Sequence, residues 1–343
     1  MPTRLPAEWE PQSGIMLTWP HQATDWQPIL AEVERVFVEL GVHITRFEKL
    51  LIVCFDQPHL AHVQQLLEQS DTDMSRVLLR TCKSNDSWAR DHGPVTLYHD
   101  DTLQLVDFRF NGWGNKHPAD LDNAINRCLF EQGTFQTQQL DATDFVLEGG
   151  SIESDGQGTL LTTTTCLLSP HRNPALSRSD IEDKLKRLLG FERILWLEHG
   201  ALEGDDTDSH IDTLARFCDA QTIMVQTCDD PEDSHYPSLQ AMLGELRRFK
   251  TAQGEPYQLV ELPLPGAIHD AQGQRLPASY ANFLILNQAV LLPVYADPVD
   301  ERVIEIFKAT FTDRQIIPVN ARALIQQYGS IHCLTMQLPA GVL

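Results

Sequence analysis

Short apolar runs and amphipathic stretches alternate along the whole chain. The run Leu50–Phe55 is apolar and lies between charged neighbours, which predicts a buried strand. The stretch Asp25–Leu40 carries apolar residues at helical spacing and is followed by Gly41, so we predict a helix that ends at this glycine. Because strands and helices follow one another in this way, the pattern predicts an α/β fold.

The second half of the chain continues the alternation. Ser179–Glu182 has the form of a capping box, which predicts a helix start, and Gly190 is expected to end that helix. No linker rich in proline, glycine or serine divides the chain and no repeat is visible, so we expect a single domain over residues 1–343. The other predicted elements are the strands Val95–Tyr98, Arg193–Leu197, Tyr280–Leu286, Ala289–Val294 and Gln315–Val319, and a helix over Glu301–Phe311.

Charge narrows the range of partners. The formal net charge is −22. Binding to nucleic acid or to an anionic membrane requires a basic surface, so the composition argues against both. A negative field favours the approach of a small cationic substrate, although the same charge also serves solubility.

The cysteines and the N-terminal segment bear on the compartment. There are seven cysteines, an odd number, and no C-x-x-C pair, which argues against a disulfide framework and against a zinc finger. We therefore expect reduced cysteines, as in a cytosol. Pro2, Pro6 and Pro11 interrupt the N-terminal segment, which excludes the apolar core of a signal peptide, and no apolar run approaches the ~18 residues of a membrane span. The expected location is cytoplasmic.

Two residues are candidates for covalent and acid–base chemistry. Cys333 lies in a short apolar run after Gly329 and could act as a thiolate nucleophile; the alternative is an ordinary buried cysteine. His210 lies among aspartates, which raise the pKa of a histidine and suit it to general acid–base catalysis. If Ser209–Ala215 begins a strand, His210 and Asp212 point to the same face. A polar loop or a metal site over Asp205–Asp212 is the alternative.

Acidic and aromatic residues at predicted strand ends could bind a flat cation. Asp91 precedes a predicted strand and Glu148 follows one, and a carboxylate can hold a guanidinium by paired, charge-assisted hydrogen bonds. Trp88 and Trp113 could stack on the cation. The alternatives are an exposed Arg90–Asp91 pair, an exposed turn residue at Glu148 and two core tryptophans.

Several motifs, taken in order along the chain, resemble the agmatine deiminase and Porphyromonas-type peptidylarginine deiminase family of the pentein superfamily. The resemblance covers nearly the whole sequence. The matching motifs are Glu8–Pro11, Trp88–Pro94, Phe110–Gly114, Leu147–Ser151, Thr164–Leu168, Arg172–Pro174, Asp205–Asp212 and Ile331–Cys333.

This resemblance implies a pentein fold, a five-bladed α/β propeller of ββαβ units around a central site. It implies that Cys333 is the nucleophile, His210 the acid–base group, and Glu148 a support for binding and proton transfer. Asp91 and Asp212 would bind the guanidinium, with Trp88, Trp113, Arg90 and Asp206 as further substrate-binding candidates. No metal or organic cofactor is implied, and a homodimer is compatible with the family.

The resemblance favours agmatine as the substrate of a hydrolase that acts on C–N bonds of amidines. The acidic chain suits a dication, and the product would be N-carbamoylputrescine, a step towards putrescine. Free or peptidyl arginine is the alternative, for which Arg90 or Arg109 would have to bind a carboxylate. Amidino transfer and a metal-binding, non-catalytic protein are further alternatives. Asn111–Pro118, with its glycines and Trp113, is a candidate lid.

Overall fold

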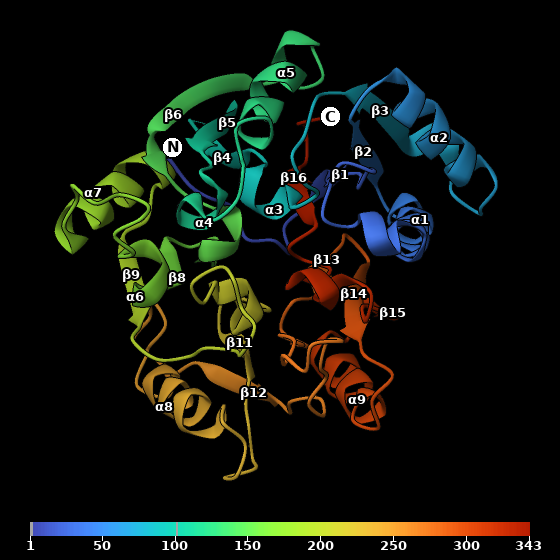
Figure 1. Ribbon diagram of the computed structural model, residues 1–343. Helices are drawn as coiled ribbons and strands as arrows, with labels where there is room; N and C mark the ends of the chain where they lie inside the picture. Colours follow the sequence, from blue (N-terminus) through green and yellow to red (C-terminus); the bar gives the residue numbers. More distant parts are fainter. Residues whose placement is uncertain (1–2, 101) are drawn as a thin grey trace.

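The computed structural model describes residues 3–100 and 102–343, and its strands form five small sheets arranged around a common centre (Figure 1). One sheet has four strands: β16 (Thr335–Pro339), β1 (Gln12–Thr18), β2 (Lys49–Cys54) and β3 (Val77–Thr81). The three-stranded sheets are β4 (Val95–His99), β5 (Thr102–Arg109), β6 (Gln138–Val146); β7 (Glu153–Ser154), β8 (Thr159–Thr163), β9 (Arg193–Leu197); β10 (Ala215–Phe217), β11 (Thr222–Gln226), β12 (Gln258–Leu262); and β13 (Leu284–Ile285), β14 (Ala289–Val294), β15 (Gln315–Asn320).

The sheets repeat one pairing scheme. In each three-stranded sheet, the first two strands are antiparallel and the last two are parallel. A parallel neighbour requires a crossover, usually a helix, and the longer helices supply it. The helices are α1 (Leu30–Thr45), α2 (Gln57–Glu68), α3 (Ala89–His92), α4 (Gly112–Asn115), α5 (Ile125–Glu131), α6 (Thr164–Leu167), α7 (Arg178–Leu189), α8 (Tyr236–Leu246) and α9 (Asp300–Thr310).

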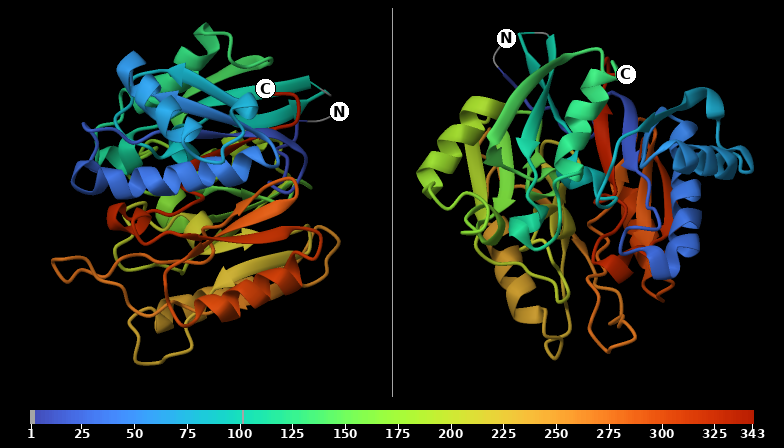
Figure 2. Two further views of the ribbon diagram at one scale, coloured as in Figure 1. Left: turned by 90° about the vertical axis from the view of Figure 1, so that its right-hand side faces the viewer. Right: turned by 45° about the horizontal axis from the view of Figure 1, so that its top comes forward.

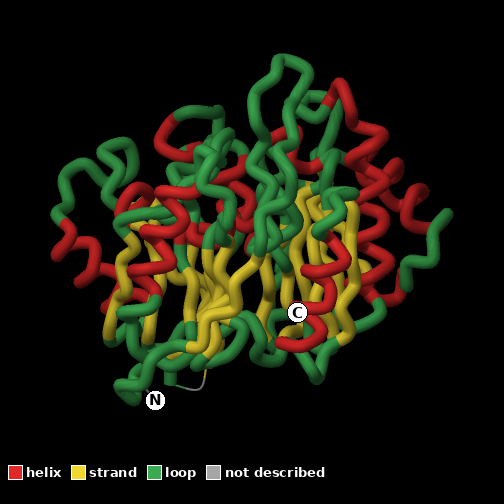
Figure 3. Tube along the Cα trace, turned by 90° about the horizontal axis from the view of Figure 1, so that it is seen from below, coloured by secondary structure: helices red, strands yellow, loops and turns green. Residues whose placement is uncertain are grey.

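The two ends of the chain close the ring together. β16 pairs antiparallel with β1, and β1 pairs parallel with β2, so the four-stranded sheet combines both ends of the sequence. The right-hand view of Figure 2 shows the dark-blue strand β1 and the red strand β16 side by side. The strands run through the interior, and the long helices lie outside them (Figure 3). The α/β prediction is confirmed. In the part of the chain described, no helix is long and apolar enough to cross a bilayer.

The first predicted helix is displaced along the chain, because α1 begins at Leu30 rather than at Asp25, after a short 3-10 helix over Gln27–Ile29. α1 continues past Gly41 to Thr45, because Ile44 and Thr45 are themselves buried against the core. Gly41 serves close packing instead, since a Cβ there would lie 3.1 Å from the Leu67 side chain of α2.

Two further boundaries differ from the prediction. The capping box is formed by Ser177 and Asp180, not by Ser179 and Glu182, and Glu182 instead accepts a hydrogen bond from Trp196. Gly190 does end the helix, with a left-handed backbone. Of the predicted strand Tyr280–Leu286, only Leu284–Ile285 pairs, because side chains of other segments bind the backbone before it, as Gln226 does at the Tyr280 amide. The other predicted strands and the helix over Glu301–Phe311 are confirmed within a few residues at each end.

The expectation that all cysteines are reduced is wrong. Cys82 and Cys128 form a disulfide, with Cα atoms 6.1 Å apart across 46 positions of sequence. The other five cysteines are free and buried. Spacing alone does not reveal the bond, because only folding brings the end of β3 beside α5.

Candidate active site

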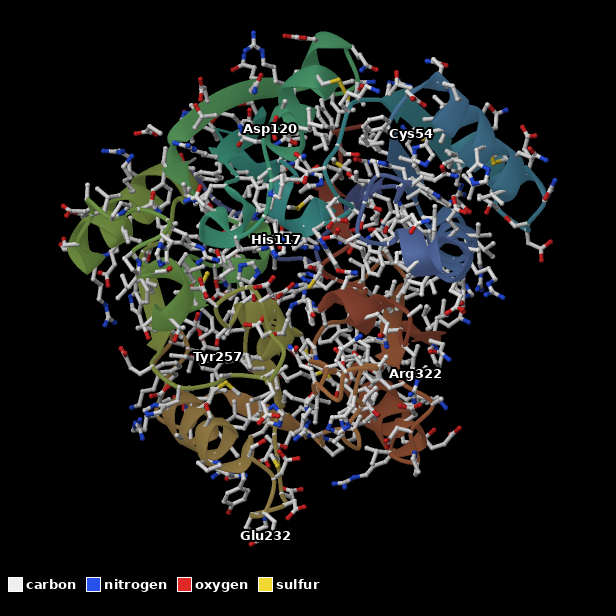
Figure 4. The ribbon with its side chains drawn as sticks, in the orientation of Figure 1. Cys54, His117, Asp120, Glu232, Tyr257 and Arg322 are labelled. Atoms are coloured by element: carbon white, nitrogen blue, oxygen red, sulfur yellow. A yellow bond between two sulfur atoms is a disulfide. The ribbon has the colours of Figure 1, made fainter. Side chains whose placement is uncertain are left out.

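An acidic, aromatic pocket opens near the centre of the ring, where Figure 4 shows His117. Trp88 and Trp113 form part of its wall, and Cys333 lies at its inner end. The lining residues are Asp25, Asp86, Trp88, Asp91, Trp113, His117, Asp206, Thr207, Gln327, Tyr328, Gly329 and Cys333.

Cys333 is held in place by a loop that precedes β13. The Asn282 side-chain oxygen accepts hydrogen bonds from the backbone amides of His332 (3.0 Å) and Cys333 (3.3 Å), and its amide nitrogen lies 3.2 Å from the Cys333 Sγ. The Sγ also lies 3.7 Å from Asp212 Oδ2. Burial, together with Asp212 and Asp91, raises the pKa of the Cys333 thiol well above its ordinary value. The thiolate therefore requires a nearby positive charge.

Asp91 lies in the short helix α3, before the strand β4, and it is buried. Its Oδ2 accepts a hydrogen bond from the Trp113 indole at 2.9 Å, and its Oδ1 accepts one from the Gly150 amide at 3.0 Å. Burial raises the pKa of Asp91 to about 6, although His210 opposes the shift. The predicted exposed Arg90–Asp91 pair does not exist.

Asp212 presents one unsatisfied oxygen. Its Oδ2 lies 2.7 Å from His332 Nδ1, whereas its Oδ1 is buried without a hydrogen-bond partner. The second nitrogen of His332 lies 2.7 Å from Glu8 Oε2, and Arg216 in turn donates to Glu8 at 2.8 Å. Burial raises the pKa of Asp212, but His332 and His210 outweigh it and lower that pKa. A charged carboxylate with a free oxygen is suited to a cationic donor.

His210 is fully buried, and neither of its ring nitrogens has a hydrogen-bond partner. Its Nδ1 lies 3.6 Å from Asp91 Oδ1. Burial lowers the pKa of His210, but Asp91 and Cys166 outweigh it and raise that pKa to about 10. The reasoning from strand alternation is wrong, because Ile211–Thr213 is a 3-10 helix and β10 begins only at Ala215. His210 and Asp212 nevertheless both face the centre.

Gly150 allows these groups to approach one another. A Cβ at this position would lie 2.6 Å from His210 Nδ1 and 2.8 Å from Asp91 Oδ1. Only a residue without a side chain fits there. Close packing of the site, and not just the turn that Gly150 helps to form, therefore requires glycine at this position.

Glu148 is fully buried rather than exposed at a strand end. Arg172 donates from Nε to both of its carboxylate oxygens, at 2.9 and 3.0 Å, and also binds Asp208. An unpaired carboxylate in this position would be strongly disfavoured, so Arg172 is required to keep it charged. Sequence reasoning noted Arg172 in a motif but assigned it no role.

The remaining substrate-binding candidates divide into two groups. Trp88, Trp113 and Asp206 line the pocket. Arg90 does not, because its guanidinium faces a separate cavity, where it binds Gln337 and lies 3.6 Å from Glu8. Arg109 is exposed beside another surface cavity.

The aspartates of the Asp205–Asp212 segment do not converge on one ion. Asp205 accepts hydrogen bonds from Thr207 and Ser209 of its own loop. Asp206 lies 2.6 Å from His117, and Asp208 is bound by Arg172 and Lys116. A calcium-like site formed by this segment is therefore not supported.

Four residues that position Cys333 and Asp212 were not predicted from the sequence as functional residues. They are Asn282, His332, Glu8 and Arg216. Glu8 and His332 stand in motifs that carry the family resemblance, which is the one signal that could have found them. Asn282 and Arg216 had no such signal, since their partners are distant in sequence.

The sequence and the fold are similar to those of known proteins. Residues 4–339 match the family model of the Porphyromonas-type peptidyl-arginine deiminase. The chain belongs to this family. It is 33% identical to an agmatine deiminase from Stutzerimonas stutzeri, over 98% of this chain and 95% of the relative.

Solved structures of family members are close to this one. A putative arginine deiminase from Porphyromonas gingivalis is 47% identical with a TM-score of 0.94, covering 99% of both chains. A cysteine-to-serine variant of the agmatine deiminase from C. jejuni, solved with substrate bound, is 37% identical with a TM-score of 0.91, covering 99% of this chain and 97% of that one.

Proposed function

We propose that this protein is an agmatine deiminase, which hydrolyses agmatine to N-carbamoylputrescine and ammonia. The observation that carries the proposal is the pocket itself. Cys333 and Asp91 line it together with further aspartates. Asp212 lies 3.7 Å from the Cys333 Sγ, and His210 lies 3.6 Å from Asp91. The names of the family's relatives support the same reaction.

The charge of the pocket favours an amine over an amino acid as the tail of the substrate. Asp25, Asp86 and Asp206 line the pocket, and no arginine or lysine is among its lining residues in the described chain. The α-carboxylate of arginine would lack a cationic partner there, whereas the ammonium of agmatine would meet carboxylates. Similarity to putative arginine deiminases keeps free or peptidyl arginine as the second candidate.

The residues account for a covalent mechanism. Asp91 and the free oxygen of Asp212 would bind the guanidinium and hold its central carbon near Cys333. The bound cation offsets the two carboxylates that disfavour ionisation of Cys333, so substrate binding promotes the thiolate. Glu148 and its partner Arg172 would maintain the charge balance around His210.

The chemical steps balance without a cofactor. The thiolate adds to the guanidinium carbon, and His210 protonates the departing nitrogen, which leaves as ammonia. The S-alkylthiouronium that remains is attacked by water, which His210 deprotonates. Collapse of that adduct expels the Cys333 thiolate and releases the ureido product.

We also propose that the ring of five sheets is the five-bladed pentein propeller.

The test is ureido-product formation with agmatine, arginine and a peptidyl-arginine mimic, by wild type and Cys333→Ala. We expect turnover of agmatine, abolished in Cys333→Ala. Asp86→Asn should raise the KM for agmatine by about tenfold and leave kcat little changed, because it removes the negative charge that faces the tail. The Asp86 carboxylate also accepts hydrogen bonds from the Trp88 indole and the Ser87 amide, and the asparagine oxygen can still accept one of them. Preference for an arginine substrate would refute the choice of agmatine, and absence of turnover with all three would refute the deiminase proposal.

A further inference from the structure

Three buried side chains beside the catalytic centre have the donor atoms of a metal site. The Glu148 carboxylate, the Cys166 Sγ and a ring nitrogen of His210 all lie within 4.8 Å of one another. They come from different parts of the ring, since Glu148 follows β6, Cys166 lies in α6 after β8, and His210 precedes β10. Cys166 forms no bond to the substrate in the mechanism above, although it helps to raise the pKa of His210.

The state of His210 points independently to a missing ligand. The side chain is fully buried, and neither of its ring nitrogens has a partner at ordinary hydrogen-bond geometry, although Asp91 and the Cys166 thiol both face the ring. Buried polar groups in folded proteins are generally satisfied, so an unpartnered imidazole requires an explanation. A nitrogen of the substrate would be the partner of one ring nitrogen of His210. An ion that is also bound by Cys166 would be the partner of the other.

The chemistry of the donors selects the class of ion. Thiolate, imidazole and carboxylate are the ligands of zinc and cobalt, whereas magnesium and calcium require oxygen. We propose that Glu148, Cys166 and His210 reversibly bind a thiophilic divalent cation such as Zn²⁺, and that the bound ion inhibits the enzyme. The inhibitory half of this proposal rests on the proposed function; the binding half does not.

Charge balance is compatible with such an ion in a fully buried place. Binding requires a deprotonated thiol and a neutral imidazole, so Zn²⁺ replaces one proton of Cys166 and one of a protonated His210. The ion brings two positive charges into the site, and the two released protons remove two. The charges facing the cluster, Asp91, Asp212 and Arg172, then experience the same net charge as before.

Inhibition follows from the same ligands. A metal-bound His210 can neither protonate the leaving nitrogen nor deprotonate water. Arg172 opposes binding, because it holds both oxygens of Glu148 and must release one of them. This competition makes the site one for a reversible inhibitor rather than for a permanently bound cofactor.

Cobalt(II) tests the binding without any need for turnover. Titration of the purified, metal-free wild type with Co²⁺ should produce a thiolate-to-cobalt charge-transfer band that saturates at one equivalent and disappears on addition of Zn²⁺. Cys333→Ser should keep the band, and Cys166→Ser should lose it. Cys54→Ser, which removes another buried free thiol, is the matched control and should behave as wild type.

Activity measurements complete the test. Zn²⁺ should inhibit wild type, and Cys166→Ser should turn over substrate in its absence while requiring more than about tenfold higher Zn²⁺ for inhibition. Thermal unfolding shows whether each variant is folded, and Cys166→Ala serves as a second variant. A band that is lost in Cys333→Ser but kept in Cys166→Ser, or no band in wild type, would overturn the proposal. A band without turnover would leave the metal site standing and refute the deiminase function instead.

Discussion

At the scale of single residues, burial decides which charges are available for chemistry. Asp91 has a pKa raised to about 6 by burial, and Cys333 has a pKa raised well above its ordinary value for the same reason. Both shifts arise because a low-dielectric site disfavours an isolated charge, and both are opposed by a bound cation. The free pocket is therefore arranged to become fully charged only when a guanidinium enters.

This gives a prediction for pH dependence. Asp91 must be ionised to bind the guanidinium, so kcat/KM should fall below about pH 6, by about tenfold per pH unit. At saturating substrate the bound cation lowers the pKa of Asp91, so the acid limb of kcat should lie at lower pH. Steady-state rates measured between pH 4.5 and 8 check this.

A control is needed because burial also raises the pKa of Asp86 to about 6. Asp86→Asn should weaken agmatine binding but keep the acid limb of kcat/KM. Loss of the limb in this variant would assign the titration to Asp86 and contradict the role given to Asp91.

At the scale of elements, short segments between strands carry the site. α3 presents Asp91, α6 presents Cys166, and the 3-10 helix over Ile211–Thr213 presents Asp212. The segment Asn111–Pro118 borders the pocket through Trp113 and His117, and its role as a lid stays a prediction. The neighbouring strands position these segments, and buried hydrogen bonds such as those of Asp91 and Asp212 hold them in place.

The disulfide connects one such segment to a helix. It joins Cys82, which precedes the segment bearing Asp86 and Trp88, to Cys128 of α5. Removing it in Cys82→Ser/Cys128→Ser should lower the free energy of unfolding by up to about 4 kcal/mol, the chain-entropy value for a loop of this length. Chemical denaturation without reductant measures the loss.

A count of thiols provides the accompanying check. Denatured wild-type protein without reductant should react as five thiols, and as seven after reduction. Cys228→Ser, which removes a free cysteine, should change stability much less than the double variant. Seven reactive thiols before reduction would show that the bond is absent.

At the scale of the whole molecule, the pairing of β1 with β16 joins the two ends of the chain. Leu338 and Val342 are fully buried in the packing between the first two sheets, and Cys333 immediately precedes β16. The closure of the ring and the placement of the nucleophile thus depend on the same strand.

Truncation tests this dependence. Deleting residues 338–343 should lower the melting temperature markedly and abolish activity, because β16 loses the two residues that pair with Gln12 and Gly14, and the buried side chains of Leu338 and Val342 are removed from the core beside it. A circular permutant that joins the termini by a flexible linker and opens the exposed turn at Gly254 should keep both. Full activity of the truncated protein, measured beside the permutant, would contradict the role of closure.

Some features follow from the sequence by itself. The α/β class, six of the strands, the helices α1, α7 and α9, and the chemical types of the site residues could be predicted, because they depend on local periodicity and on motifs. Cys333, His210, Asp91, Asp212 and Glu148 were all named from such signals.

Other features are decided only by the tertiary structure. Three of them join residues that are distant in sequence: the Cys82–Cys128 bond, the pairing of Glu148 with Arg172, and the link from Asp212 through His332 to Glu8. A fourth, the position of Arg90 outside the pocket, depends on the direction of its side chain. Periodicity specifies which face of an element is buried, but it does not specify which other element covers that face. In a ring of similar sheets, the central residues come from every part of the chain. They therefore meet only when β16 has paired with β1 and closed the ring.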